Sequence, residues 1–133
     1  VFYLLFNPLY APIPQADRGQ YINDWPAGWG VREVNAFLLN QSRNQHITVI
    51  TEGTFGLLPY AIEMYLVNNP NITITGIWPL TSQIPEPVAE AIGKEPTYLI
   101  MNKDEVPGAW SATLLAQYQK GLRRDRFLRL YRL

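Results

Sequence analysis

Three glutamates are the side chains best placed for acid–base chemistry. Glu52 directly follows a short apolar run, and Glu33 and Glu63 lie on the predicted helices before and after it. A pair of carboxylates flanking a glycosidic bond can hydrolyse that bond. Glu63 lies about two helical turns beyond the loop that begins at Glu52, so these two carboxylates are poorly placed to cooperate. An independent two-carboxylate hydrolase is therefore the third choice among the functions considered.

The loop at residues 52–56 is the main candidate for ligand binding. In open α/β sheets, ligands bind beside the loops that leave the carboxyl ends of strands. The loop lacks the Lys-Ser/Thr pair of a phosphate-binding loop, and Glu52 would repel a phosphate at a helix N-terminus. Two interpretations of the loop remain. It is either a site for a small ligand, such as a sugar or a nucleotide, or a tight turn that needs its glycines in order to fit. The candidate ligand-binding residues in it are Glu52, Gly53, Thr54 and Gly56.

Few other reactive side chains are present. The chain has no cysteine and one histidine, His46, which excludes disulfides and leaves little for zinc binding or a His-based triad. His46 precedes the predicted central strand, at the opposite end from the candidate loop, and no Gly-x-Ser-x-Gly motif or dinucleotide fingerprint occurs. We therefore predict no cofactor and no metal.

Charge and composition point away from nucleic acid. Eleven basic and eleven acidic residues cancel, so no global field attracts a polyanion. Aromatic residues make up 13% of the chain. Trp and Tyr pair an apolar body with a polar edge, which suits contact with carbohydrate or with a membrane interface, although they also serve as core and turn residues. The candidate stacking side chains are Trp25, Trp29, Tyr60 and Trp78.

The elements that position these side chains follow from hydrophobic patterning. Residues 47–51 are apolar or Thr at every position, which predicts a strand buried on both faces. Residues 72–78 alternate and residues 97–102 form an apolar run, which predicts two more strands. Helices predicted at residues 57–66 and 87–92 separate the three strands, so the strands should be parallel with right-handed crossovers.

The C-terminal quarter of the chain is predicted to contain one helix and one strand. Residues 110–118 are expected to form the helix, with Ser111 as its N-cap. Residues 126–133 are expected to form a strand at the sheet edge, antiparallel to its neighbour. The arginines at positions 126, 129 and 132 would discourage pairing of such an edge with another chain.

The N-terminal part is predicted to be irregular. Residues 11–30 are rich in Pro and Gly, which favours extended, turn-rich chain. Residues 1–10 are apolar but too short to span a bilayer, so they are either an edge strand or the end of a preceding membrane helix in a longer protein. From Val31 a helix is expected that runs to about Asn44 and directs Asn35 outward.

These predictions describe one α/β domain over residues 1–133, of which residues 1–30 form an extended N-terminal segment. We expect a small three-layer α/β/α arrangement around a mostly parallel sheet of about four strands. The expected strand order is 2-1-3-4, with the last strand antiparallel.

Two segments carry a resemblance to a known family. These are ADRGQYINDWPAGWGVRE, residues 16–33, and TEGTFGLLPY, residues 51–60. They resemble the C-terminal extracytoplasmic region of bacterial polytopic membrane glycosyltransferases, of the dolichyl-phosphate-mannose protein mannosyltransferase and aminoarabinose transferase class. The resemblance covers most of the chain. It implies a protein that transfers a sugar from a polyprenyl-phosphate carrier on the extracytoplasmic face of the cell membrane.

The resemblance also implies how this chain takes part. In that class the catalytic acids lie in the membrane part and its first external loops, so no catalytic residue carries over and the chain alone is expected to be inactive. The first expectation is a non-catalytic accessory domain whose partners are the membrane-embedded part of the same polypeptide and a carbohydrate or lipid-linked sugar. The alternative is a free-standing α/β module that binds a small ligand at residues 52–56.

Overall fold

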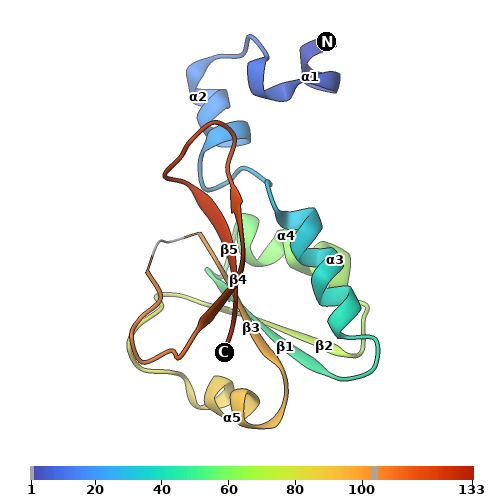
Figure 1. The fold of residues 1–133 in the computed structure, drawn as a ribbon, viewed down its shortest axis with the longest axis vertical. Helices are drawn as coiled ribbons and strands as arrows, with labels where there is room; N and C mark the ends of the chain where they lie inside the picture. Colours follow the sequence, from blue (N-terminus) through green and yellow to red (C-terminus); the bar gives the residue numbers. More distant parts are fainter. Residues whose placement is uncertain (1, 103–104) are drawn as a thin grey trace.

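The computed structural model describes residues 2–102 and 105–133 as one open five-stranded sheet with helices against both faces (Figure 1). The strands lie in the order β2-β1-β3-β5-β4. Strand β1 is parallel to β2 and β3, whereas β5 is antiparallel to β3 and β4. Their bounds are β1 Ile47–Glu52, β2 Ile72–Ile77, β3 Thr97–Met101, β4 Thr113–Gln119 and β5 Phe127–Arg132. The mixed α/β class and the parallel centre of the sheet are as predicted.

Strand β1 lies inside the sheet, and all six of its residues are buried. Its side chains alternate between the two faces: Val49 packs in one apolar cluster and Ile50 in the other. The chain can bury both faces because every position before Glu52 is apolar or a threonine. The prediction of a buried central strand is confirmed.

Helices α3 (Val31–Gln41) and α4 (Leu57–Leu66) cover one face of the sheet, and α5 (Glu86–Lys94) covers the other. The predicted helix at residues 57–66 is confirmed except at Leu58, whose φ of −109° and ψ of 123° are not helical; Leu58, Ile62 and Leu66 are buried. Tyr65, which helical spacing places on the same stripe as Ile62, is nevertheless 69% exposed. Burial therefore follows a narrower stripe than the sequence indicates.

Helix α3 differs from its prediction at two points. It ends at Gln41 rather than near Asn44. Asn35, predicted to face outward, is 5% exposed, and its Nδ2 donates a hydrogen bond to the carbonyl oxygen of Ala61 at 3.2 Å. The two helices thus share a polar contact across their interface, which hydrophobic periodicity does not reveal.

The C-terminal predictions were partly wrong. Residues 113–119 form strand β4, not a helix, and this strand is the sheet edge. The last strand, β5, therefore lies inside the sheet between β3 and β4, and its antiparallel direction is confirmed. Five strands replace the four expected in the order 2-1-3-4. Residues 113–119 pair with β5 along their length, apart from a register shift between Leu114 and Ala116, and this long-range contact outweighs their helical pattern.

The N-terminal segment is more regular than predicted. Helix α1 (Phe2–Phe6) replaces the proposed edge strand, and Val1 lies outside the described residues. Short helices η1 (Pro8–Tyr10), α2 (Gln15–Arg18) and η2 (Gly19–Asn23) follow, although residues 11–30 were expected to be extended. Among the described residues, none of the helices has the length and apolar character needed to cross a membrane.

Candidate functional site

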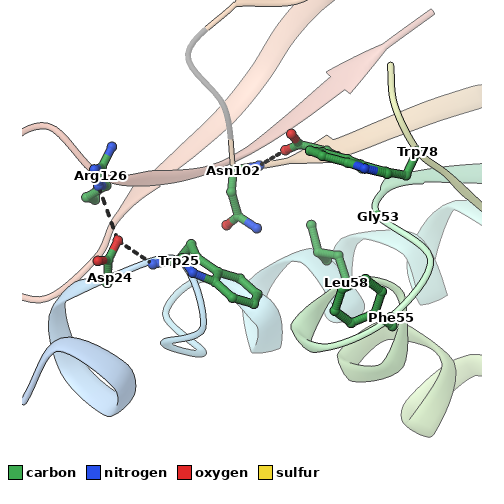
Figure 2. Close-up of a pocket in the computed structure, with 9 residues that line it drawn as sticks. Asp24, Trp25, Gly53, Phe55, Leu58, Trp78, Asn102 and Arg126 are labelled. Atoms are coloured by element: carbon green, nitrogen blue, oxygen red, sulfur yellow. Dashed lines mark hydrogen bonds and ion pairs between the residues drawn. The ribbon is translucent and has the colours of Figure 1, made fainter. Parts of the chain in front are cut away.

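A cavity of about 570 Å³ lies at the carboxyl ends of the parallel strands (Figure 2). Nine residues from five separate segments line it: Asp24, Trp25, Glu52, Gly53, Phe55, Leu58, Trp78, Asn102 and Arg126. A cavity of this size, lined by aromatic rings and a few polar groups, is typical of a small-molecule site.

Three neighbouring parallel strands each deliver one residue to the rim. Glu52 ends β1, Trp78 follows β2, and Asn102 follows β3. Their order along the rim repeats the strand order, because parallel strands end at the same edge of a sheet. The candidate loop predicted at residues 52–56 therefore lies beside a cavity.

The loop also needs its glycines for a tight approach to β2. Gly53 has a φ of +111°, and its N–H donates to the carbonyl oxygen of Ile77 at 2.8 Å. A Cβ added at Gly76 would lie 2.5 Å from the carbonyl oxygen of Gly53. Residues 52–56 therefore form the tight turn that was one of the two alternatives for this loop.

Glu52 and Asn102 present hydrogen-bond acceptors to the cavity. Glu52 is 7% exposed, and its Oε2 accepts a hydrogen bond from the backbone N–H of Asn102 at 2.9 Å. The side-chain Oδ1 of Asn102 is buried, and no partner for it occurs among the described residues. Figure 2 shows the Asn102 side chain pointing into the space between Trp25 and Trp78. A buried amide oxygen in this position favours a ligand that brings a hydrogen-bond donor.

The opposite wall comes from the N-terminal segment and the last strand. The Oδ1 of Asp24 accepts a hydrogen bond from the backbone N–H of Trp25 at 2.9 Å and pairs with Nε of Arg126 at 3.2 Å. Because this ion pair is roughly half-exposed, water screens it and it adds little to the stability of the fold. Its effect is to hold the Asp24 and Arg126 side chains together in the cavity wall. The carboxylates of Asp24 and Glu52 line the same cavity, whereas the glutamates at positions 33 and 63 do not line it.

The predicted site residues separate into two groups. Trp25, Glu52, Gly53 and Trp78 line the cavity. Thr54, Gly56, Tyr60 and Trp29 do not line it. Gly56 lies next to the Trp25 ring, since a Cβ added there would be 3.5 Å from it, and the indole N–H of Trp29 donates to the carbonyl oxygen of Ile22 at 2.7 Å.

Sequence reasoning missed four lining residues, Asp24, Leu58, Asn102 and Arg126, and it included a fifth, Phe55, only as part of the loop at residues 52–56. Asn102 could have been found, because it ends the parallel strand predicted at residues 97–102, at the same edge of the sheet as Glu52. Asp24 and Arg126 carried no such signal, since they lie 102 residues apart (126 − 24) in segments whose pairing depends on the folded chain.

A second polar cluster lies at the other end of the sheet. Nδ1 of His46 is 2.6 Å from Oε2 of Glu95, and Nε2 of His46 is 3.2 Å from the hydroxyl of Thr73. The hydroxyl of Thr48 donates to Oε1 of Glu95, and this hydrogen bond is the main reason that the pKa of Glu95 is lowered, with His46 adding to the effect. The cluster connects β1, β2 and the turn before β3.

No group of three or more His, Asp or Glu side chains within residues 2–102 and 105–133 could hold a metal ion. Comparison of the chain with protein-family models, with curated protein sequences and with solved structures found no match. Function is therefore inferred from the cavity and from the resemblance of the sequence.

Proposed function

We propose that this domain binds a neutral saccharide in the cavity beside residues 52–56. The observation that carries the proposal is the pairing of Trp25 and Trp78 with the carboxylates of Asp24 and Glu52 around one cavity. An indole ring offers an apolar face to the C–H groups of a sugar ring, and carboxylates accept hydrogen bonds from its hydroxyls. Sugar binding thus accounts for both kinds of side chain.

The charges around the cavity favour a neutral sugar over a nucleotide. Asp24 and Glu52 contribute two carboxylates, and Arg126 contributes one guanidinium, which is already paired with Asp24. Either carboxylate would repel a phosphate bound beside it, and this repulsion strengthens as water is excluded. We therefore expect a nucleoside monophosphate to bind more weakly than a monosaccharide.

Ligand-observed NMR with D-mannose, D-glucose, D-galactose, L-arabinose and UMP tests the proposal. At least one sugar should bind, and Trp25→Ala or Trp78→Ala should weaken its affinity by about fivefold, in keeping with the energy of one aromatic contact. Tyr65→Ala is the matched control, because it removes an exposed ring that does not line the cavity. No binding of any sugar, or tighter binding of UMP, would contradict the proposal.

A second proposal concerns the context of this domain. We infer that it is the extracytoplasmic accessory part of a membrane glycosyltransferase that uses a polyprenyl-phosphate sugar donor, with the membrane-embedded part of the same polypeptide as its partner. Besides the sequence resemblance, the exposure of Tyr3, Leu5, Phe6 and Tyr10, which ranges from 49% to 73%, favours it. Such a run of exposed apolar side chains suits a membrane or protein contact.

The coding sequence upstream of Val1 tests this second proposal. Several apolar runs of about 18 residues or more would support it. A start codon close to Val1, with no such run, would contradict it. Neither result affects the test of sugar binding, because that test uses only the present chain.

A further inference from the structure

Lys120 is completely buried, which is unusual for a lysine. It follows β4, and its Nζ donates hydrogen bonds to two backbone carbonyl oxygens, that of Trp25 at 2.6 Å and that of Ala27 at 2.9 Å. These two carbonyls belong to the turn that carries Trp25 into the cavity wall. The side chain therefore connects the β4–β5 hairpin to the ligand site across 95 residues of sequence.

The backbone around Lys120 is packed tightly against the same N-terminal segment. Asn23 accepts a hydrogen bond from the N–H of Leu122 through its Oδ1 at 3.3 Å. Gly121 has a φ of +56°, and a Cβ added there would lie 2.5 Å from the carbonyl oxygen of Ile22. The hairpin and the segment around Trp25 therefore fit together with no room for a larger residue at Gly121.

A buried ammonium is costly, so a purely structural role would be served better by an apolar side chain. Burial lowers the pKa of Lys120 to about 8, and Asp24, the charged group that acts on it, opposes this effect. The desolvation is offset by hydrogen bonds to Trp25 and Ala27, and these bonds fix backbone atoms rather than fill space. An ammonium provides this fixed geometry, and a hydrocarbon of similar length does not.

We propose that Lys120 is a positioning residue for the ligand cavity: by bonding the carbonyls of Trp25 and Ala27, it holds the Trp25 indole in the cavity wall. The functional meaning of this contact rests on the proposed sugar site. The contact itself can be tested without any ligand, so its failure and the failure of the sugar proposal are distinguishable.

The ligand-free test uses 5-fluorotryptophan and 19F NMR on the full chain. Lys120→Met should move or broaden the Trp25 signal and leave the Trp110 signal unchanged, because Trp110 is buried against the opposite face and donates to the carbonyl oxygen of Thr81 at 2.7 Å. Lys94→Met is the matched control, since Lys94 is exposed on α5 and pairs with Glu90. An unchanged Trp25 signal in Lys120→Met would overturn the proposal.

A pH titration of the unsubstituted chain covers the case in which Lys120→Met does not fold. The Trp25 19F shift should change with a midpoint near pH 8, the pKa of the amine bonded to its carbonyl, and the Trp110 shift should not. Absence of that midpoint overturns the proposal. If a sugar from the panel binds, Lys120→Met should also weaken its affinity, by up to the fivefold expected for loss of Trp25 itself.

Discussion

At the scale of single residues, Lys120 links the stability of the fold to pH. Its pKa in the folded chain is about 8, against an ordinary value of 10.5, so the unfolded chain holds this proton to higher pH. Between these two values the unfolded state binds more protons, and stability rises as the pH rises.

The quantity to follow is the difference in free energy of unfolding between the unsubstituted chain and Lys120→Met. We expect this difference to increase by about 3 kcal/mol from pH 8 to pH 10.5. Urea unfolding at several pH values measures this difference. The subtraction removes the contributions of tyrosines and other lysines that titrate in the same window. A difference that stays flat would show that the Lys120 ammonium is not desolvated.

Glu95 gives a pH dependence of the same sign, but in acid rather than in base. Its pKa is lowered chiefly by the hydroxyl of Thr48, so the stability it contributes is present above its ordinary pKa of 4.5 and is lost as the pH falls through the lowered value. Thr48→Val should lower the free energy of unfolding by about 1–2 kcal/mol at pH 7 and should reduce its loss in acid. Thr75→Val, at an exposed position of β2, is the control and should change little. Equal effects of the two substitutions would contradict this role of Thr48.

At the scale of elements, the sequence was informative where one face or both faces of an element are buried. Strand β1 and helix α4 could be predicted, because their apolar spacing matches a period of two or of 3.6 residues. Strand β4 could not be predicted, because it lies at the sheet edge and five of its seven residues are exposed. Its leucines at positions 114 and 115 are consistent with either period, and only pairing with β5 decides between them.

The approach of β2 to the candidate loop can be tested with a pair of glycine substitutions. Gly76→Ala places a Cβ 2.5 Å from the carbonyl oxygen of Gly53, so it should cost about 1–3 kcal/mol of stability and displace the cavity rim. Gly93→Ala, in α5, meets no atom within 4 Å and should stabilise the helix by about 0.5–1 kcal/mol. Thermal unfolding of both variants gives the comparison. A neutral Gly76→Ala would mean that the loop is not held against β2.

At the scale of the whole molecule, the cavity joins a rim that could be predicted to a wall that could not. The rim follows from parallel strands that end at one edge, so Glu52 and Trp78 could be proposed as neighbours. The wall depends on contacts between the N-terminal turn and the β4–β5 hairpin, such as the pair of Asp24 with Arg126. Local patterns carry no information about such contacts, because their residues are far apart in the sequence.

The most direct measurement is a two-dimensional NMR spectrum of the four tryptophan indole N–H groups during titration with the monosaccharides. We expect the signals of Trp25 and Trp78 to shift in proportion to bound sugar. The signals of Trp29 and Trp110 should stay in place, because their N–H groups are already bonded to backbone carbonyls outside the cavity. Four unmoved signals with every sugar, or shifts confined to Trp29 and Trp110, would contradict a saccharide site between Trp25 and Trp78.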